Sequence, residues 1–564
     1  FNLKNGSTTV LTSGKGSSSV SGVRWVSNDR LIFTASPTNS AAKSISAYAM
    51  WGMNIDGSKK RKLFEFSTAQ GAIVRPSLTS LLPEEPNYIM ISENSRRGSV
   101  DDYYKLNINT GAKKKIANGP DVDDAEWISN VIVRTDGIPL AAVSNRIDEW
   151  RIWRYFPEQK KWEVHFTNKC QKPTFFPLSG NDDTWLVAGQ DVSKYDSFND
   201  ENDKSKLFSY DPNNRTFELL YEDAEYDVAG PVGGCRQAQG GASIDEKTNE
   251  LIYVSYYGEK PVRLFFDDDV QQTNDMLEAA FPGQDVRPVT WSKDRNKLVI
   301  AVSSSTNPGD YYYFDKENGT LSFLWDRSPW INRNILSPKQ PISYIARDGL
   351  KIHGYLTIPL NSSGQNMPMV VHPHGGPNAR DTFGYDPYVQ FLASRGYAVF
   401  QPNFRGSTGY GAKHYIIANK QFGKTMQDDI TDGVNYLINK GVADRDRIAI
   451  FGGSYGGYAT MAGLAFTPDL YAAGINYVGV VDLELLQEGS NRNSERFNGF
   501  YHELRLEWGD PDLPEDMDYI IETSPLRQAA NIKAPVLIMH GAQDNNVKLV
   551  HAKRLADRLQ SLDK

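Results

Sequence analysis

The chain has 564 residues, of which 40% are hydrophobic and 23% charged, and its formal net charge is -8. This length exceeds one hydrophobic core, so we expect two or more domains. The negative charge without basic runs argues against a nucleic-acid partner, and no stretch approaches the roughly 20 apolar residues of a membrane span. The two cysteines, Cys170 and Cys235, predict neither a disulfide scaffold nor a metal site, and they leave the compartment, cytoplasmic or periplasmic/secreted, open.

An internal repeat dominates residues 1 to about 330. Each copy has an aromatic or apolar strand, a turn of Asp, Asn, Gly or Pro, and a second strand that ends in apolar residues. Successive copies start 50, 53, 49, 54, 56 and 48 residues apart. Further strand-like sequence precedes each copy except the first. The copies begin at Phe1, Trp51, Tyr104, Trp153, Leu207, Arg263 and Tyr311, and the one at Arg263 is weaker.

Four short strands in every 50 or so residues are typical of a β-propeller blade. The repeat therefore predicts a seven-bladed propeller over residues 1–334, with an incomplete first blade. A β-sandwich is the alternative, and it would leave the even spacing unexplained. Because the chain begins at Phe1 inside a hairpin pattern, without methionine or signal peptide, we expect its true start to lie elsewhere.

The pattern changes after Trp330, and residues 335–564 alternate short apolar strands with helical segments. Two strands flank the turn Asp348-Gly349, and later strands form continuous apolar runs. This alternation predicts a doubly wound, mostly parallel sheet, in which ligands bind at the carboxyl ends of the strands. The runs are 342–345, 352–358, 368–372, 397–400, 447–451, 473–477 and 536–540.

The sequence Gly452-Gly453-Ser454-Tyr455-Gly456-Gly457-Tyr458 lies between the run at 447–451 and a helical segment. A G-x-S-x-G motif in a strand–turn–helix context is a nucleophile elbow, in which small residues permit a sharp turn that exposes the serine hydroxyl. Ser454 is therefore the predicted nucleophile. A glycine-rich turn that only joins strand to helix is the alternative.

Two further strand ends supply the groups that acyl transfer needs. His374-Gly375-Gly376-Pro377 matches an oxyanion loop, and we expect the N–H groups of Gly376 and Tyr455 to be the oxyanion donors. Asp544 follows the strand at 536–540 and lies 90 residues after Ser454. The order serine then acid is the one that an α/β-hydrolase requires, so Asp544 is the predicted acid.

A third strand end carries Asn403-Phe404-Arg405-Gly406-Ser407-Thr408-Gly409-Tyr410-Gly411. Arg405 is a candidate substrate-binding residue at the same rim, or else it braces the loop, and the bracing role is favoured. Acidic pairs such as Asp123-Asp124 and Asp267-Asp268 could bind a substrate amine, although such loop charges are usually only solvated.

Together these motifs resemble the prolyl oligopeptidase family of serine peptidases, most closely its acylaminoacyl-peptidase-like and dipeptidyl-peptidase-like branch. The resemblance is strong from about 340 onward and weak in the repeat region, and it also rests on the runs at 523–526 and 540–547. It implies a propeller that caps the hydrolase and excludes folded proteins, and it supports the roles of Ser454, Asp544, Gly376 and Tyr455.

No histidine in this sequence lies where the fold would place the catalytic histidine. In this fold it lies a helix and a strand beyond the acid, about 20 to 30 residues on, whereas Lys564 is 20 residues after Asp544. His551 belongs to the helix that follows the acid, His502 precedes the acid, and His374 belongs to the oxyanion loop. We therefore expect the catalytic histidine and the last strand to lie outside this sequence, which would leave a sheet edge exposed. A pseudoenzyme without this histidine is the alternative.

The sequence as a whole predicts a serine exopeptidase or oligopeptidase that acts on short peptides through an acyl-enzyme, without metal or organic cofactor. Two other functions stay open: an inactive propeller–hydrolase binding protein, and a carboxylesterase. Neither cleavage specificity nor homo-oligomerisation can be predicted from these residues.

Overall fold

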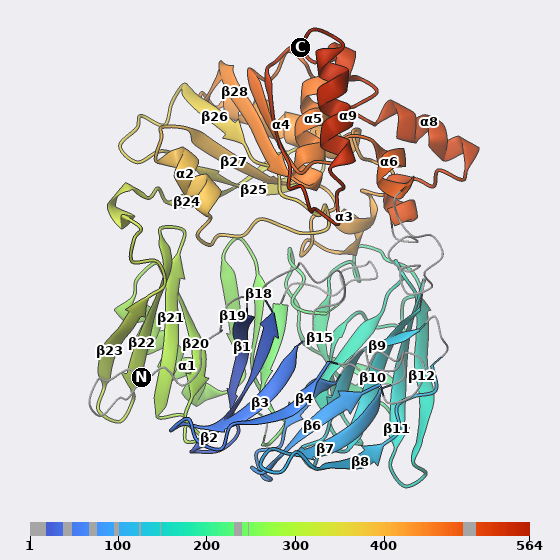
Figure 1. Ribbon diagram of the computed structural model, residues 1–564, viewed down its shortest axis with the longest axis vertical. Helices are drawn as coiled ribbons and strands as arrows, with labels where there is room; N and C mark the ends of the chain where they lie inside the picture. The colour runs from blue at the N-terminus through green and yellow to red at the C-terminus, as the bar shows by residue number, and fades with distance from the viewer. Residues whose placement is uncertain are drawn as a thin grey trace.

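The computed structural model describes residues 18–37, 48–66, 76–94, 101–122, 126–146, 148–230, 240–245, 247–488 and 504–564. The N-terminal part consists of small antiparallel sheets arranged side by side, and the C-terminal part is an α/β domain that lies over them (Figure 1). The two parts are a β-propeller and an α/β-hydrolase domain. No helix among the described residues is long and apolar enough to cross a membrane.

The described propeller residues form six sheets, five with four strands and one with three. In chain order the sheets are β1 (Ser18–Trp25), β2 (Arg30–Pro37), β3 (Ala49–Asn54), β4 (Arg61–Glu65); β5 (Ser77–Leu81), β6 (Tyr88–Glu93), β7 (Asp102–Asn107), β8 (Lys113–Ala117); β9 (Trp127–Val133), β10 (Pro139–Arg146), β11 (Glu149–Phe156), β12 (Lys161–Lys169); β13 (Phe175–Gly180), β14 (Trp185–Gly189), β15 (Lys206–Asp211), β16 (Thr216–Tyr221); β17 (Gly240–Ile244), β18 (Leu251–Tyr257), β19 (Pro261–Phe265); and β20 (Asp285–Trp291), β21 (Lys297–Ser304), β22 (Asn307–Asp315), β23 (Thr320–Asp326).

The described residues form six blades rather than the predicted seven, because the first of the seven repeats lies outside them. The copies at Trp51, Tyr104, Trp153, Leu207 and Tyr311 form the third and fourth strands of their sheets. The weaker copy at 263 forms the end of β19 and continues into helix α1 (Asp268–Ala280). The copy at 1–12, which no inner strands precede in the sequence, lies outside the described residues.

Neighbouring blades pack through apolar side chains from both sheets. Met90 and Tyr103 of β5–β8 share one buried cluster with Trp153 and Tyr155 of β9–β12. Similar clusters join β1–β4 to β5–β8, β9–β12 to β13–β16, and β13–β16 to β17–β19. Aromatic side chains bury large areas and pack in specific geometries, so these clusters fix each blade against the next.

The hydrolase domain is built on a seven-stranded sheet in the order β24-β25-β27-β26-β28-β29-β30. The two strands at the β24 edge are antiparallel to their neighbours, and all pairs from β27 to β30 are parallel. The strands are β24 (Lys339–Ile345), β25 (Lys351–Thr357), β26 (Met367–Val371), β27 (Ala398–Asn403), β28 (Ala443–Gly453), β29 (Ala473–Tyr477) and β30 (Val536–Met539).

The helices pack on both faces of this sheet, and their apolar sides share one large core with the strands (Figure 1). Strand order reverses between β27, β26 and β28, which is the kind of switch point where doubly wound sheets bind ligands. The helices and 3-10 turns are η2 (Arg333–Ile335), α2 (Pro387–Ala393), α3 (Ala412–Ile416), α4 (Thr425–Asn439), α5 (Tyr455–Phe466), α6 (Leu483–Glu488), α8 (Pro514–Glu522), η4 (Ala529–Asn531) and α9 (Val550–Gln560).

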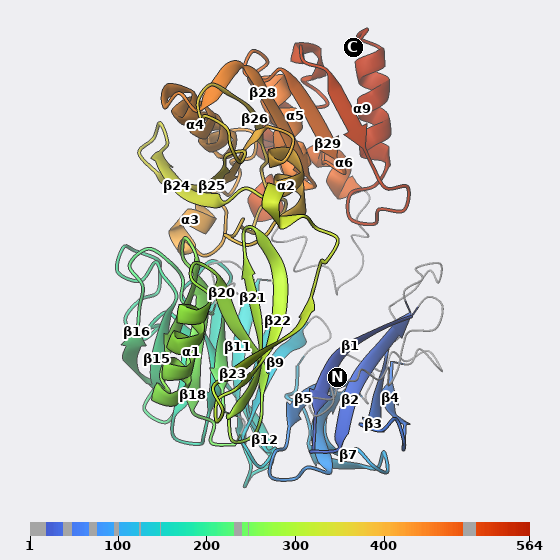
Figure 2. The same ribbon diagram turned by 90° about the vertical axis from the view of Figure 1, so that its left-hand side faces the viewer.

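The propeller contacts the hydrolase domain through the rim of blades β13–β16 and β17–β19. Tyr410, from the loop after β27, packs in one buried cluster with Val228, Val254 and Tyr256 of the propeller. Figure 2 shows α3 and the chain around it directly above these blades. The carboxyl ends of the parallel strands therefore face the propeller.

One feature of the propeller was not anticipated from the sequence. Cys170, in the loop after β12, is disulfide-bonded, whereas the chain's other cysteine, Cys235, lies outside the described residues.

Candidate active site

Ser454 occupies the sharp turn between β28 and α5. Its φ is 57° and its ψ is -118°, a strained conformation for a residue with a side chain. The backbone N–H of Ser454 donates to the carbonyl of Tyr477 on the neighbouring strand at 3.0 Å, which fixes the turn against β29. Ser454 is half-buried at the carboxyl end of β28, as the elbow motif predicts.

Two glycines make this turn sterically possible. A Cβ at Gly452 would lie 2.4 Å from the backbone of Gly456, and a Cβ at Gly456 would lie 2.2 Å from the carbonyl oxygen of Pro373. Both separations are far below van der Waals contact. The small residues two before and two after Ser454 are therefore required by the close approach of strand, helix and the loop after β26.

The predicted oxyanion loop lies directly against the elbow. A Cβ at Gly375 would be 3.5 Å from the Cβ of Ser454, and Gly376 is exposed next to it with a φ of 126°. Tyr455 is the first residue of α5, where N–H groups have no partner within the helix and the helix dipole favours negative charge. The backbone N–H groups of Gly376 and Tyr455 thus belong to two segments that meet at Ser454.

His374 holds the oxyanion loop rather than acting as a base. Its Nδ1 lies 2.8 Å from the carbonyl oxygen of Gly375, and its Nε2 lies 2.9 Å from Oγ of Ser407. Burial lowers the pKa of His374 to about 4, so the neutral ring donates from Nδ1 and accepts the Ser407 hydroxyl proton at Nε2. The ring also stacks on Phe404, with centroids 4.5 Å apart.

The hydrogen bond from His374 Nδ1 to the carbonyl of Gly375 affects the predicted oxyanion donor, the N–H of Gly376. The carbonyl of Gly375 and the N–H of Gly376 belong to one peptide unit, which is planar. Fixing the oxygen through His374 therefore also fixes the direction of the Gly376 N–H. The H-G-G motif predicted the position of His374 in this loop. Its contacts with Ser407 and Phe404 could not be predicted, because these residues lie in a separate stretch of the sequence.

Asp544 follows β30 in a turn that is held mainly by its own bonds. Its carboxylate accepts from the N–H groups of Asn546 and Val547, both at 2.9 Å. Strand β30 is the edge strand of the sheet, with Leu537 54% and Met539 38% exposed. An exposed sheet edge was expected at this end of the domain, and among the described residues β30 is such an edge.

None of the described histidines forms a hydrogen bond with Ser454 or Asp544. His551 is 1% exposed and accepts from the N–H of Val481 at 3.3 Å, and burial lowers its pKa to about 4. His540 donates from Nε2 to the carbonyl of Val547 at 2.8 Å. His502 lies outside the described residues.

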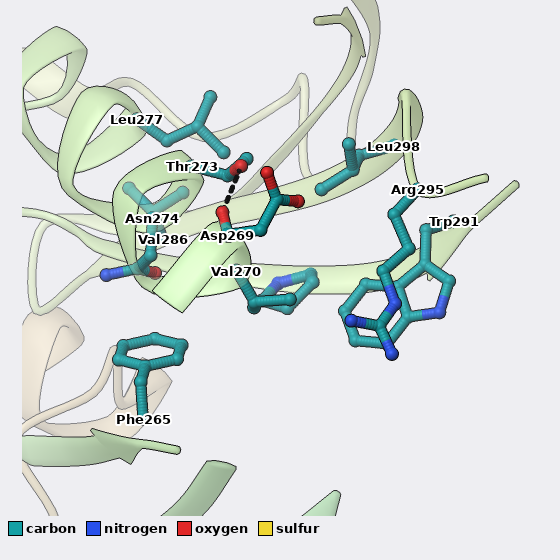
Figure 3. A pocket seen from close by; sticks show the side chains of 11 residues that line it. Phe265, Asp269, Val270, Thr273, Asn274, Leu277, Val286, Trp291, Arg295 and Leu298 are labelled. Atoms are coloured by element: carbon teal, nitrogen blue, oxygen red, sulfur yellow. Dashed lines mark hydrogen bonds between the residues drawn. The ribbon is translucent and has the colours of Figure 1, made fainter. Parts of the chain in front are cut away.

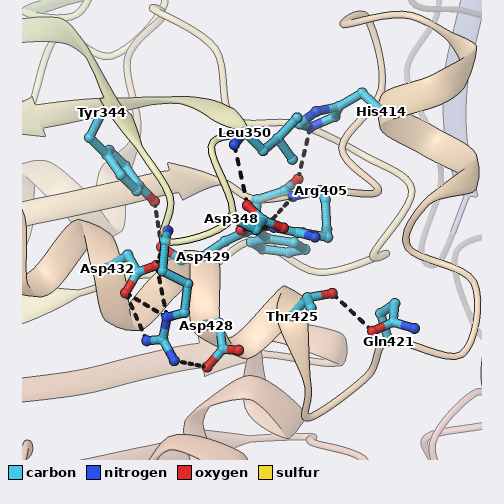
Figure 4. Close-up of polar contacts among 12 residues, drawn as sticks. Tyr344, Asp348, Leu350, Arg405, His414, Gln421, Thr425, Asp428, Asp429 and Asp432 are labelled. Carbon is cyan, nitrogen blue, oxygen red and sulfur yellow. Dashed lines mark hydrogen bonds and ion pairs between the residues drawn. The ribbon is translucent and has the colours of Figure 1, made fainter.

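Arg405 is held by two carboxylates inside the hydrolase domain (Figure 4). Its Nε and Nη2 donate to Asp429 of α4 at 2.8 and 2.7 Å, and Nη2 lies 2.7 Å from Asp348. These partners raise the pKa of Arg405 above its usual range. A guanidinium so engaged braces the loop, which favours that role over substrate binding. No sequence pattern indicated that Asp429 is the partner.

The acidic pairs have different positions. Asp267 caps the N-terminus of α1 and forms an ion pair with Arg295, so it is occupied within the propeller. Asp123 and Asp124 lie outside the described residues. Figure 3 shows the space between α1 and the strands β20 and β21, which is lined by apolar side chains such as Val270, Leu277 and Leu298. It is part of the propeller, whereas Ser454 lies in the other domain.

Fold and site together define a propeller-capped α/β-hydrolase with a nucleophile elbow. The family model described as "Prolyl oligopeptidase family" matches residues 383–564. Dipeptidyl aminopeptidase BIII of Pseudoxanthomonas mexicana is 31% identical over 495 residues, which cover 85% of this chain and 67% of that protein. The chain belongs to the prolyl oligopeptidase family of serine peptidases.

Other similarities agree with this assignment. Dipeptidyl peptidase family member 6 of Caenorhabditis elegans is 28% identical over 431 residues, 72% of this chain and 55% of that protein. The chain thus spans between about half and two thirds of the length of these two relatives. Among solved structures, a puromycin-hydrolyzing peptidase of Mycobacterium tuberculosis superposes with a TM-score of 0.63 at 18% identity, over 96% of this chain and 89% of that one. This likeness concerns the fold.

Proposed function

We propose that this protein hydrolyses short peptides through an acyl-enzyme formed on Ser454. The observation that carries the proposal is the strained elbow of Ser454, with the oxyanion loop so close that a Cβ added at Gly375 would lie 3.5 Å from the Cβ of Ser454. A serine hydroxyl in this setting is exposed to substrate, and preorganised N–H donors lie beside it. A loop whose only role is to connect β28 and α5 would not need this second segment.

In the proposed reaction Ser454 Oγ attacks the scissile carbonyl. The N–H groups of Gly376 and Tyr455 stabilise the oxyanion while the general base holds the Ser454 proton. The C–N bond then breaks, the leaving amine takes that proton, and water hydrolyses the acyl-enzyme. Asp544 orients the imidazole that serves as general base. We assign that base to none of the described histidines, because none forms a hydrogen bond with Ser454 or Asp544.

The substrate class follows from the cap and from the relatives. The active-site edge of the sheet faces the propeller, so a folded protein would have poor access to Ser454. The relatives named dipeptidyl aminopeptidase and acylamino-acid-releasing enzyme support an exopeptidase or oligopeptidase without choosing between them. Dipeptidyl, acylaminoacyl and single aminoacyl groups stay as competing acyl groups on Ser454, and the amine of the remaining peptide is the leaving group in each case.

A fluorophosphonate probe tests the proposal on the protein expressed from its complete reading frame. An activated serine is labelled, and Ser454→Ala should remove the label. Absence of labelling in the unmodified protein would instead support an inactive binding protein. Peptide anilides and p-nitrophenyl esters of the same acyl group then separate the peptidase from a carboxylesterase, since the esterase would turn over only the esters.

A further inference from the structure

Arg380 is a hydrolase-domain arginine that binds the propeller backbone. It lies four residues after Gly376, and only 7% of it is exposed. Its Nη1 donates to the carbonyl of Tyr257 at 2.8 Å and its Nη2 to the carbonyl of Gly258 at 2.9 Å. Tyr257 is the last residue of β18, and Gly258 begins the turn between β18 and β19 of the propeller. The guanidinium position therefore depends on where the propeller lies.

The other partners of Arg380 are also uncharged. Nη2 donates to the hydroxyl of Tyr410 at 2.8 Å, and the guanidinium lies 4.3 Å from the centroid of the Tyr410 ring. Within the described residues no carboxylate pairs with Arg380. A buried cation is costly unless its donors are satisfied, so Arg380 is stable in this position only while the propeller carbonyls are present.

A short, tightly hydrogen-bonded turn connects Arg380 to the oxyanion donor. The N–H of Ala379 donates to the carbonyl of Pro377 at 2.8 Å, and Thr408 N–H donates to the carbonyl of Ala379 at 2.9 Å. A Cβ on Gly376 would lie 2.7 Å from the nitrogen of Asn378. These contacts make the turn rigid, so a displacement of Arg380 would also displace Gly376.

The propeller also fixes the surface on which Arg380 rests. The carboxylate of Asp227 accepts from Gly411 N–H at 3.0 Å, and the N–H of Asp227 donates to the carbonyl of Gly409 at 3.1 Å. Lys204 Nζ donates to the carbonyl of Tyr410 at 2.9 Å. The loop that carries Arg380 and the loop that carries Tyr410 are thus both held by residues of blades β13–β16 and β17–β19.

We propose that Arg380 is a positioning residue through which the docked propeller sets the direction of the Gly376 N–H. Docking of the propeller and assembly of the oxyanion site are then one event, and the hydrolase domain is competent for acyl transfer only when Arg380 is bound to the β18–β19 turn. This inference rests on the proposed peptidase function.

The test compares Arg380→Met and Arg380→Lys with Lys351→Met in the full-length protein. Lys351 forms the ion pair with Glu225 of the propeller at 2.7 Å, but both side chains are about half exposed, so this variant removes an interdomain contact away from the oxyanion loop. The readouts are kcat and KM on a short peptide anilide and the affinities for a peptide boronate, which forms a tetrahedral adduct, and for the product peptide.

Arg380→Met should lower kcat about 10- to 100-fold. Misplacing the Gly376 N–H should cost part of the transition-state stabilisation that deleting an oxyanion donor would cost. KM and product affinity should stay within about 3-fold, while boronate affinity falls with kcat. Arg380→Lys should recover part of the loss, and Lys351→Met should behave as the unmodified protein. If Arg380→Met does not fold, Arg380→Lys must still lower kcat without raising KM.

Three outcomes would overturn the inference. They are an unchanged kcat in either Arg380 variant, a loss confined to KM, and an equal loss of kcat in Lys351→Met. Fluorophosphonate labelling separates this failure from failure of the proposed function. An unlabelled wild-type protein overturns both, whereas wild-type labelling rates in Arg380→Met overturn only the role of Arg380.

Discussion

The two sides of the candidate site differ in how firmly the structure holds them. On the nucleophile side, Ser454 lies between the oxyanion loop and α5, and contacts such as the His374–Phe404 stack join the oxyanion loop to the loop after β27. On the acid side, Asp544 is placed by two bonds within its own turn, on the half-exposed edge strand β30. The oxyanion side is preorganised by tertiary contacts, and the acid side depends on local ones.

This difference matters for catalysis because preorganisation is most effective where charge develops in the transition state. In the proposed mechanism the oxyanion forms next to Ser454, where glycine backbones and a helix N-terminus meet. The proposed acid, Asp544, acts indirectly, by orienting an imidazole. We therefore expect substitutions on the nucleophile side to affect both activity and stability, and those in the acid turn to leave stability nearly unchanged.

The largest expected effect is that of Ser454→Ala. Turnover of peptide anilides should fall by about 10³-fold or more, because no other group can form the acyl-enzyme. The melting temperature should hardly change, since the hydroxyl makes no contact that the turn requires. Ser363→Ala, in an exposed loop, is the matched control. Near wild-type turnover in Ser454→Ala would remove Ser454 from the mechanism.

The brace beneath the nucleophile side should be the most sensitive point for stability. Arg405→Met leaves the Asp429 carboxylate, which is fully buried, without its partner, and it should lower the free energy of unfolding by about 3 to 5 kcal/mol. Arg347 pairs with Asp428 and Asp432 on the same helix but is 52% exposed, so Arg347→Met should cost at most about 1 kcal/mol.

Urea denaturation of both variants measures this contrast. Equal losses would mean that burial does not distinguish the two ion pairs. If Arg405→Met were as stable as the unmodified protein and instead raised KM, Arg405 would be a substrate-binding residue rather than a brace.

Glycine substitutions test the two sides directly. The added methyl of Gly456→Ala meets the carbonyl of Pro373, so it should destabilise the protein by about 3 kcal/mol and lower activity by about 100-fold or more. In the acid turn, a Cβ on Gly541 meets nothing within 4 Å. Gly541→Ala should therefore change stability by no more than about 0.5 kcal/mol. Thermal unfolding and anilide turnover are measured for both variants. A larger loss in Gly541→Ala than in Gly456→Ala would contradict the comparison.

The sequence was informative where a local pattern determines local structure. The elbow, the H-G-G loop and the hydrolase strands were all predicted at the positions where the structure has them, because short apolar runs and glycine turns depend on nearby residues. The blade number was mispredicted because every hairpin repeat was counted as a blade, including the copy at 1–12, which no inner strands precede in the sequence. The roles of Asp429 and Arg380 also escaped prediction, since their contacts join residues that are distant in the chain and leave no periodic signal.

The smallest expected effect concerns pH and the propeller contact that supports the nucleophile side. Burial raises the pKa of Asp227 to about 6, with Lys204 opposing and Asp203 adding to the shift. Because the folded-state pKa lies above that of the unfolded chain, the folded protein binds the extra proton. This contribution to stability is complete below about pH 4 and is lost as the pH rises to 6. A shift of this size corresponds to roughly 2 to 3 kcal/mol.

The variant Asp227→Asn has no titrating group at this position. The stability of the variant relative to the unmodified protein should therefore improve between pH 4 and 6, whatever the absolute cost of the substitution. Urea denaturation at pH 4, 5, 6 and 7 gives this difference, and a constant offset across the range would show that Asp227 titrates normally in the folded protein.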